Sequence, residues 1–509
     1  MLKRFLLASI LFSTTFVVAS SSEAREWTIV GPRALGMGGA GVAVANDATA
    51  SYWNPAAFGF FKDSTGGEYG KRTWSAVLDA GFGAQVHEDL GEQVDIISRI
   101  DFNQFTGGDV TIAEMPDFIE MVSQLKTFDD NPDRALTITV NGGLRTQVGH
   151  FGLAGYAFTD ISAKGDLDLV NIGPTNDGTA TFTIAEVTDE TTYGCAPGAC
   201  TTTTGYFTAP ERTQLETFLT GLGWTSVQAT DFINIVENGI DSLPPGDVPA
   251  SSEVVTQVQN VATVVDAAAT DGGGTGGTID QNESKLLFRG IAVAEVPLTY
   301  GRKITDDFAV GGNIKFMKAR VYNTEVPVFN TDFGDALNTA TDTYADSNNF
   351  GIDLGALYRF GDKLRFGVVA RNVNSPSFDM LPLTPGGEDS IKEEPQVRAG
   401  VAYRPFGSLI LAADIDLTEN ETTVSGTSTS RIISAGIEGN LFNFLQLRGG
   451  IYKNIANEDI GPVYTAGFGV NLWAVNIDLG AAMSSGSTTV DGNEIPKEVR
   501  AELALSALF

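Results

Sequence analysis

Residues 475–484 read VNIDLGAAMS, and apolar side chains alternate along them with polar or small ones. Val475, Ile477 and Leu479 would share one face of a β-strand, with Asn476 and Asp478 on the other, because successive side chains of a strand point to opposite faces. This pattern suits a soluble β-sandwich, whose apolar face meets a core. It equally suits a transmembrane barrel, whose apolar face meets lipid. Alternation alone does not choose between the two.

The same alternation recurs from about residue 135 to the end of the chain and, together with residues 73–86, predicts about 14 strands. Their expected ranges are 73–86, 135–146, 149–161, 287–303, 308–322, 348–360, 364–375, 395–405, 408–418, 431–442, 444–454, 462–473, 475–486 and 498–509. Short connections of a few residues alternate along the chain with long polar connections. Examples of the short ones are 305–307 and 405–407, and examples of the long ones are 323–347 and 374–394. Bacterial outer-membrane barrels have short periplasmic turns and long outer loops. The sequence therefore predicts an all-β fold, an antiparallel transmembrane β-barrel of about 14 strands over residues 61–509, in the bacterial outer membrane.

The two ends of the chain agree with export. Lys3 and Arg4 precede an uncharged apolar run over 5–18, and small residues follow at 22–24, so residues 1–24 are expected to be a cleaved signal peptide. Phe509 ends an alternating strand. A terminal aromatic resembles the signal read by the barrel-assembly machinery, so we expect Phe509 to be an assembly signal, with that machinery and outer-membrane lipid as partners.

Composition excludes several classes of function. The formal charge of −31 at pH 7 argues against a nucleic-acid partner, which requires clustered Lys and Arg. Cys195 and Cys200 are the only cysteines, and in an exported protein they predict a short disulfide. Zinc is the alternative, but two thiols cannot fill a tetrahedral site. The only histidines, His87 and His150, lie in no recognisable catalytic motif, so we expect neither an enzyme nor a bound metal or cofactor.

Two long insertions, at 87–134 and 162–286, are expected to be extracellular and partly helical. Helical spacing of apolar residues supports this in three stretches. The residues are Met115, Phe118, Ile119, Val122 and Leu125, then Leu215, Phe218, Leu219 and Leu222, then Val254, Val258, Val261 and Val265. We expect these helices to pack together over the barrel mouth. The glycine cluster at 272–277 is typical of a linker.

The N-terminal segment 25–60 is expected to be a hatch that plugs the lumen. Gly36, Gly38 and Gly41 satisfy the G-x-G-x-x-G pattern, but no βαβ unit surrounds them, which argues against a dinucleotide site. The stretches GPRALGMGGAG at 31–41, NDA at 46–48 and YWNPA at 52–56 resemble the hatch of FadL-type outer-membrane transporters. This resemblance implies a 14-stranded barrel that carries fatty acids or other hydrophobic molecules and releases them sideways. It marks as hatch residues Gly36, Gly38, Gly39, Gly41, Asn54, Pro55 and Ala56.

A second resemblance covers most of the C-terminal half. RNVNSPSF at 371–378 and EPQVRAGVAY at 394–403 resemble the outer-membrane proteins labelled conjugal transfer protein TraF. An unrelated thioredoxin-like protein shares that label, but this chain lacks C-x-x-C, so no redox activity is implied. Residues 162–286 lie outside the resemblance.

Charged residues in the inward register of the strands are expected to line the lumen. They could satisfy the backbone of the hatch, or pair with one another across neighbouring strands. The residues are Asp353, Arg365, Arg371, Arg398, Arg404, Asp414, Asp416, Arg448 and Asp478.

Two functions follow from these expectations. The first is a plugged channel for hydrophobic, fatty-acid-like small molecules, with Met115, Phe118, Phe218 and Leu222 as candidate ligand contacts over the mouth. The second is a structural or accessory component of a conjugal transfer or secretion apparatus. Transport predicts an apolar path through the barrel, whereas a scaffold predicts a solid hatch and an exposed apolar patch.

Overall fold

The computed structural model contains a closed antiparallel barrel of 14 strands, which confirms the predicted fold class. It describes residues 25–61, 74–100, 102–105, 110–173, 182–271, 277, 281–327, 341–424, 428–442, 444–472, 475–490 and 492–508. The barrel strands are β1 (Trp74–Val86), β2 (Leu136–Val148), β3 (Phe151–Asp166), β4 (Lys285–Lys303), β5 (Phe308–Pro327), β6 (Tyr344–Phe360), β7 (Leu364–Arg371), β10 (Gln396–Phe406), β11 (Leu409–Asp416), β14 (Ile432–Leu441), β15 (Leu445–Asn454), β16 (Val463–Leu472), β17 (Val475–Ser484) and β20 (Glu498–Leu508).

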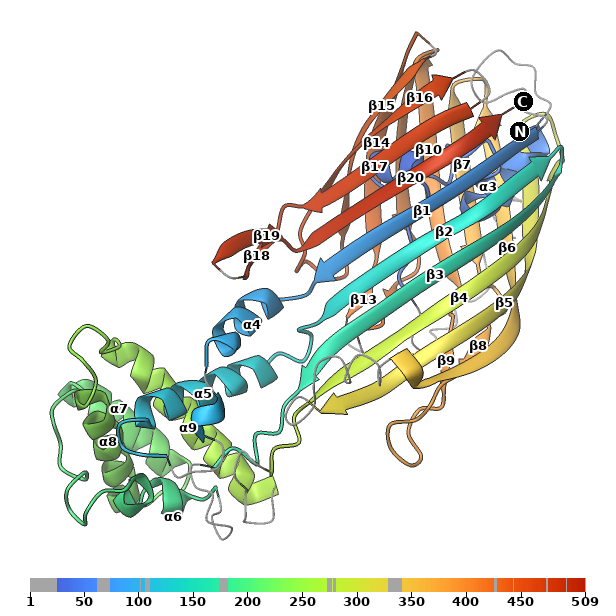
Figure 1. Ribbon diagram of the computed structural model, residues 1–509. Helices are drawn as coiled ribbons and strands as arrows, with labels where there is room; N and C mark the ends of the chain where they lie inside the picture. Colours follow the sequence, from blue (N-terminus) through green and yellow to red (C-terminus); the bar gives the residue numbers. More distant parts are fainter. Residues whose placement is uncertain are drawn as a thin grey trace, which may run out of the picture.

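Each barrel strand pairs with the barrel strands before and after it in the chain, and the sheet closes between β1 and β20 (Figure 1). At that seam Phe82 lies opposite Ala501, and β20 pairs on its other side with β17. Closure leaves no edge strand with unpaired backbone groups, which is the condition for a sheet inside a bilayer.

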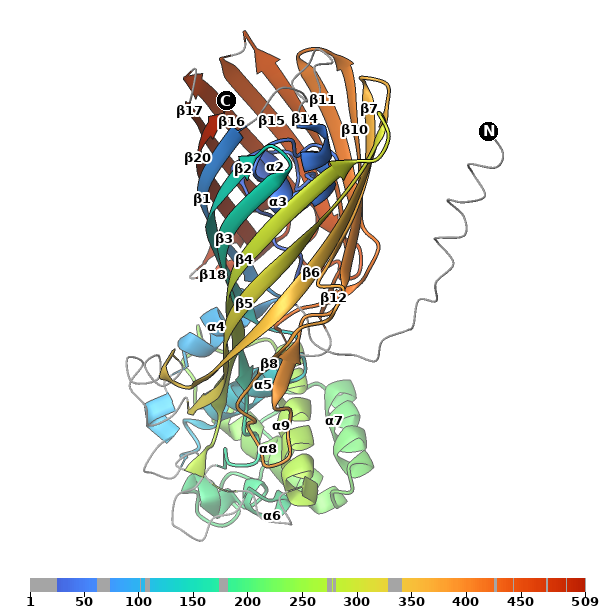
Figure 2. The same ribbon diagram turned by 90° about the vertical axis from the view of Figure 1, so that its right-hand side faces the viewer.

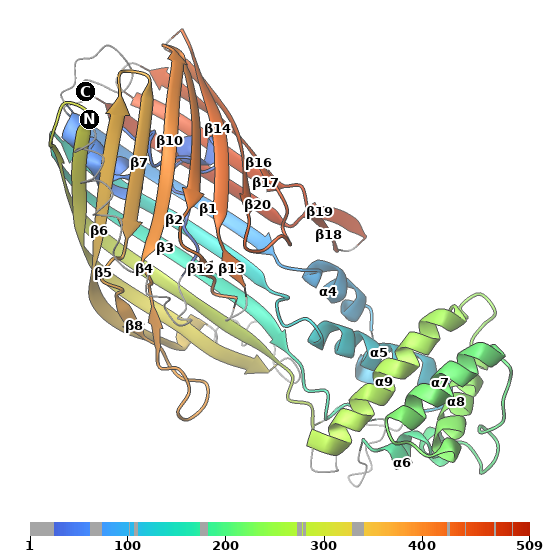
Figure 3. The same ribbon diagram turned by 180° about the vertical axis from the view of Figure 1, so that it is seen from behind.

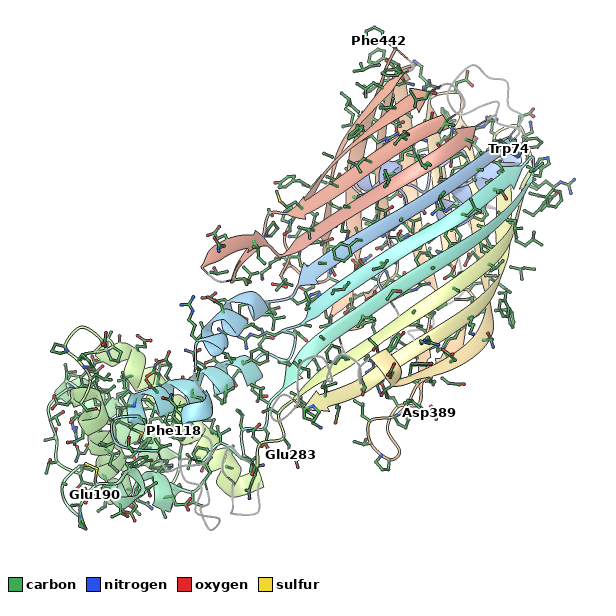
Figure 4. The ribbon with its side chains drawn as sticks, viewed as in Figure 1. Trp74, Phe118, Glu190, Glu283, Asp389 and Phe442 are labelled. Carbon is green, nitrogen blue, oxygen red and sulfur yellow. A yellow bond between two sulfur atoms is a disulfide. The ribbon has the colours of Figure 1, made fainter. Side chains whose placement is uncertain are left out.

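The barrel has a turn end and a loop end. Short turns such as 304–307, 361–363 and 407–408 lie at the turn end, together with the start of β1 and the end of β20. Figure 4 shows Trp74 and Phe442 at this end, and Phe442 is 97% exposed on the β14–β15 turn. The loop end carries both helical insertions and three hairpins, β8 (Ser377–Asp379) with β9 (Ser390–Lys392), β12 (Asn420–Glu421) with β13 (Thr429–Ser430), and β18 (Ser487–Val490) with β19 (Asn493–Pro496). This is the predicted sorting of short and long connections.

The outer surface of the wall is apolar. Leu144, Ile314 and Leu503 are 49–67% exposed, whereas the charged side chains of the opposite register, such as Asp414 and Arg398, are at most 2% exposed. The inversion of the usual inside-outside pattern indicates that the outer face meets hydrocarbon. No helix in the described part of the chain is both long enough and apolar enough to cross a membrane.

The insertions form a helical module beyond the loop end of the barrel (Figures 1 and 3). Its elements are α4 (Leu90–Ser98), η2 (Phe102–Phe105), α5 (Met115–Asp129), α6 (Ile184–Val187), η3 (Glu190–Tyr193), α7 (Ala209–Gly221), α8 (Ser226–Asp241) and α9 (Ser251–Asp271). They share one apolar core to which all three predicted stretches contribute, and Phe118, labelled in Figure 4, is fully buried in it. Helix α8 was not predicted, although Phe232, Ile233, Val236 and Ile240 of this helix are fully buried.

The second insertion is shorter than expected, 167–284 instead of 162–286, because β3 and β4 pair beyond the apolar part of their sequences. The predicted Cys195–Cys200 disulfide is confirmed, with a Cα–Cα distance of 6.1 Å. The expected signal peptide 1–24, the assembly signal Phe509 and glycines 272–276 lie outside the described residues.

Candidate functional site: the plugged barrel lumen

Residues 25–61 lie inside the barrel, where Figure 2 shows their short helices surrounded by strands. They form α2 (Pro32–Gly36), α3 (Ala50–Trp53) and η1 (Pro55–Phe60). Proline begins α2 and η1, because its fixed φ suits the first helical position and its missing N–H is not needed there. The hatch expected at 25–60 therefore occupies the lumen.

Glycines allow the hatch to touch the wall and itself. Gly38 has φ of 69°, and a Cβ there would lie 2.6 Å from the carbonyl oxygens of Ala435 and Ile451. A Cβ on Gly41 would lie 2.2 Å from the ring of Trp53. Gly39 also has a positive φ, and Gly36 packs against Gly467 of β16. Side chains at Gly36 and Gly38 would push the hatch away from the wall, and a side chain at Gly41 would displace Trp53 within the hatch.

The wall satisfies the backbone of the hatch. Asp414 accepts hydrogen bonds from the N–H groups of Gly41 and Val42 at 2.8 and 2.9 Å. Glu502 accepts from the Gly31 N–H at 2.6 Å, and the hydroxyl of Thr465 accepts from Gly38 at 3.0 Å. Buried backbone donors must find partners, and here the lumen side chains supply them.

The Asn-Pro-Ala motif fixes the end of the hatch. The Asn54 side chain accepts from the Ala56 N–H at 3.1 Å, which starts η1, and donates to the carbonyl of Ala356 in β6 at 3.0 Å. Pro55 packs against Gly311 of β5 and Gly355 of β6. All three motif residues are buried.

A second cluster of charges holds the start of the hatch. Arg25 forms ion pairs with Glu295 of β4 at 2.5 Å and with Glu393, which follows β9, at 2.8 Å. Glu295 also pairs with Lys315 of β5 and Arg371 of β7, each at 3.3 Å. One buried network thus joins the hatch, three barrel strands and the loop that carries the β8–β9 hairpin.

That hairpin covers the inner wall on the loop side of this network. Phe378 and Met380 at its first strand and Ile391 in β9 are buried against apolar side chains of β4 and β5. The wall residues are Ile291, Val293, Met317, Ala319 and Val321. The apolar lining of the mouth is therefore filled by a loop of the chain itself.

Some of the predicted lumen residues contact the hatch, and others pair with one another across the wall, which are the two roles that the sequence left open. Asp414 holds the hatch, and Arg371 lies 4.1 Å above the ring of Tyr52 in the hatch. Arg398 pairs with Asp416 of the neighbouring strand β11 at 2.9 Å, and Arg448 of β15 pairs with Asp478 of β17, two strands away, at 2.6 Å. Of the rest, Asp353 pairs with Lys315, Arg365 is buried, and Arg404 lies at the turn end, where it donates to the Gly407 carbonyl.

Sequence reasoning missed Glu295, Lys315, Glu438 and Glu502, all at most 4% exposed and all in the site. The signal was present, because Lys315 stands between Ile314 and Phe316, and each of the others also lies between apolar or small residues of the outward register. A single charge inside an apolar run marks an inward position in a barrel strand.

The described lumen contains a small cavity and a larger one. The small one, of about 30 Å³, lies on the loop side, near Glu26 and Glu498. The larger one, of about 450 Å³, lies between the hatch and the turn end of the wall. The candidate contacts Met115, Phe118, Phe218 and Leu222 line neither cavity, because the first two are core residues of the helical module and the others pack against that core.

Neither histidine has a catalytic setting. His87 is buried and its Nε2 lies 3.1 Å from the Thr137 hydroxyl, while the ring of His150 packs on Phe61 at the β2–β3 turn. Within the described ranges, no three His, Cys, Asp or Glu side chains are grouped as a metal site would require.

Comparison with known proteins assigns the chain to a family. The model of the family described as "F plasmid transfer operon, TraF, protein" matches residues 52–416, well over half of the chain. The chain belongs to this TraF family. No curated protein matches the chain significantly in sequence.

Several solved structures share overall similarity with this TraF-family chain. The Ralstonia pickettii toluene transporter TbuX is 12% identical with a TM-score of 0.43, covering 94% of this chain and 98% of that one. The toluene transporter TodX of P. putida is 11% identical with a TM-score of 0.42 over 95% and 99% of the two chains. A Pseudomonas aeruginosa FadL homologue is 10% identical with a TM-score of 0.40 over 96% and 98%.

Proposed function

We propose that this TraF-family protein is an outer-membrane channel through which hydrophobic, fatty-acid-like small molecules pass while residues 25–60 plug the lumen. The proposed location rests on the apolar outer wall and on the sorting of short turns and long loops to opposite ends. Outer-membrane lipid and the barrel-assembly machinery are the partners that this location requires.

The observation that carries the proposal is a plug with a cavity beside it in one lumen. Hydrogen bonds to the wall hold the hatch in place, and two of them are accepted by the Asp414 carboxylate from hatch N–H groups. The cavity of about 450 Å³ at its side falls within the size range of small-molecule sites, roughly 300–1,000 Å³. Protein interiors are close-packed and leave few voids larger than a water molecule, so a space of this size beside the plug favours a binding role.

The plug is tested by conductance in planar bilayers. Deleting residues 27–54 should leave a folded barrel with large ion conductance, whereas the intact protein conducts little. Asp414→Ala, which removes two hydrogen bonds to the hatch, should give brief openings. The matched control is Asp362→Ala, the same substitution at an acidic residue of the exposed β6–β7 turn. Equal conductance of the deleted and intact forms would show that the segment is not a plug.

Passage is tested in cells with an apolar dye that fluoresces only in hydrocarbon. Dye influx should rise with the level of the intact protein in the outer membrane. Gly38→Leu, which cannot fit between Ala435 and Ile451, should alter that influx at equal protein level. Influx that is independent of the protein would remove the transport proposal and leave the fold untouched.

A second proposed function is an accessory role in a conjugal transfer or secretion apparatus. The family description and the separate core of the helical module favour it, because a module of this kind suits partner binding. Residues 167–284 contain a single basic residue, Arg212, so a partner would have to be cationic or indifferent to charge. Replacing 167–284 with a short loop should then reduce plasmid transfer and leave dye influx unchanged.

A further inference from the structure

The larger cavity lies on the side of the hatch that faces the turn end. It is lined by three residues at the turn-end tips of the strands, namely Gly407 between β10 and β11, Asn440 in β14 and Asn476 in β17. Its opposite side is formed by the hatch between Val30 and Trp53. A molecule that left the lumen past the hatch toward the turn end would enter this space.

The two sides of the cavity differ in chemistry. The hatch forms an apolar side of the cavity, which Val77 and Ala504 of the wall continue. The apolar hatch residues are Pro32, Ala34, Val44, Ala45 and Trp53. The facing wall carries four side-chain amides, Asn440, Gln446, Asn471 and Asn476, and the hydroxyl of Ser506. Such a surface fits a molecule with one apolar face and one face of hydroxyl or carbonyl groups.

The charged side chains that line the cavity already have partners, either in the lining or directly behind it. Glu438 binds Arg33 at 2.6 Å and Arg448 at 2.7 Å, and Arg448 also binds Asp478 at 2.6 Å. Asp79 pairs with the fully buried Arg145. Arg404 donates to the carbonyl of Gly407, and Asp47 accepts from the hydroxyl and N–H of Thr49.

This arrangement disfavours a charged ligand. The lining side chains comprise three arginines and three aspartates, so their formal charges cancel. A carboxylate would lose its hydration, and to gain a counter-charge it would have to compete with the carboxylates that bind Arg33 and Arg448 or with the carbonyl that binds Arg404. A hydroxyl or carbonyl group needs only a hydrogen bond, which an amide supplies without rearrangement.

We propose that this cavity binds an uncharged amphipathic molecule, with its apolar face on the hatch and its polar face on the wall amides, and that it discriminates against the corresponding carboxylate. The inference rests on the proposed channel function and narrows its substrate class. Among fatty-acid-like molecules, the ionised acids would then be poor ligands, and the neutral alcohols, esters or ketones of the same chain length good ones.

The test uses Trp53, which lines the cavity and donates to the Val30 carbonyl at 2.9 Å. Two probes of equal chain length, a terminally brominated alkanol and the brominated alkanoate, are added at pH 8 to the full-length protein in neutral phosphatidylcholine nanodiscs. Bromine quenches tryptophan at contact, and subtracting the Trp53→Phe variant removes quenching of the other tryptophans. The alkanol should saturate the Trp53 signal at a concentration at least tenfold below that of the alkanoate.

A gain-of-function variant guards against misfolding as an explanation. Asn476→Lys places an extra cation in the lining and should lower the half-saturating alkanoate concentration several-fold. Asn348→Lys makes the same change on the exposed loop end of β6 and should leave both probes unchanged.

Three outcomes would overturn the inference. These are equal quenching by both probes, preference of the unaltered protein for the alkanoate, and no quenching that depends on Trp53, which would make the cavity a water-filled space. Dye influx in cells is measured independently. If the probe experiment fails while dye influx is normal, only the cavity proposal is wrong. If the probes bind as expected but no dye influx occurs, only the proposed channel function is wrong.

Discussion

Glu237 is the clearest case of a single residue that organises its surroundings. Its carboxylate is buried in the helical module, where it accepts from the N–H groups of Phe207 and Thr204 at 3.0 Å and pairs with Arg212 at 2.8 Å. The hydroxyl of Thr203 donates to it at 2.9 Å. One side chain thus fixes residues 203–207, which lead into α7.

The pH dependence of this contact has a definite sign. Burial would raise the pKa of Glu237, but the hydrogen bonds from Phe207, Thr203 and Thr204 and the contact with Arg212 outweigh it, so the pKa lies below its ordinary value of 4.5. Because the folded pKa is depressed, the stabilisation is complete above the unfolded pKa. It is lost as the pH falls through the folded value.

We expect Glu237→Gln to destabilise the helical module by about 2 kcal/mol at pH 7, the usual scale for hydrogen bonds to a charged group. The difference from the unaltered protein should shrink as the pH falls below 4.5, the ordinary pKa of a glutamate. Emission of the buried Trp224, isolated by subtracting Trp224→Phe, reports opening during a denaturant titration at each pH. Glu253→Gln, an exposed position on α9, is the control, and an equal effect of both substitutions would contradict the assignment.

At the scale of elements, the Cys195–Cys200 loop predicts a local effect only. The disulfide joins two cysteines that are five positions apart in the sequence. Glu190 also accepts hydrogen bonds from the N–H groups of Gly198 and Cys200, so the loop stays restrained without the disulfide. Changing both cysteines to serine should cost at most about 2–3 kcal/mol by loop-closure reasoning. Hydrogen exchange should rise in 190–205 and stay unchanged in α9. Faster exchange throughout the module would show a global role.

Strand boundaries show where sequence patterns stop being informative. Strand β7 ends at Arg371, not at 375 as expected, because Asn372 and Ser375 adopt positive φ values that end the extended backbone. Strand β5 instead continues to Pro327, five residues past the predicted end. Tyr322, the predicted end, lies opposite Gly290 of β4. Pairing with β4 continues beyond it and maintains a part of the strand that has no alternating pattern of its own.

For the whole molecule, closure of the sheet predicts resistance to detergent. Unheated protein in dodecyl sulfate should migrate faster than boiled protein, because the ladder between β1 and β20 has no free edge at which to open. Leu503→Pro removes an N–H from β20 and should abolish the faster form, while Leu503→Val should retain it. Identical migration of heated and unheated protein would contradict a closed barrel.

The barrel, its 14 strands and the sorting of its connections can be read from the sequence alone. Period-2 alternation and loop length are local properties that a lipid-facing wall imposes directly. The inward register likewise identifies Asp414 and Arg398 as charged residues of the lumen. Their partners follow only from the folded chain, because Asp414 meets Gly41 across 373 positions of sequence, whereas Arg398 meets Asp416 on the next strand. The cavity beside the hatch has the same origin, since its sides come from opposite ends of the chain and their separation is set by packing, which no local pattern encodes.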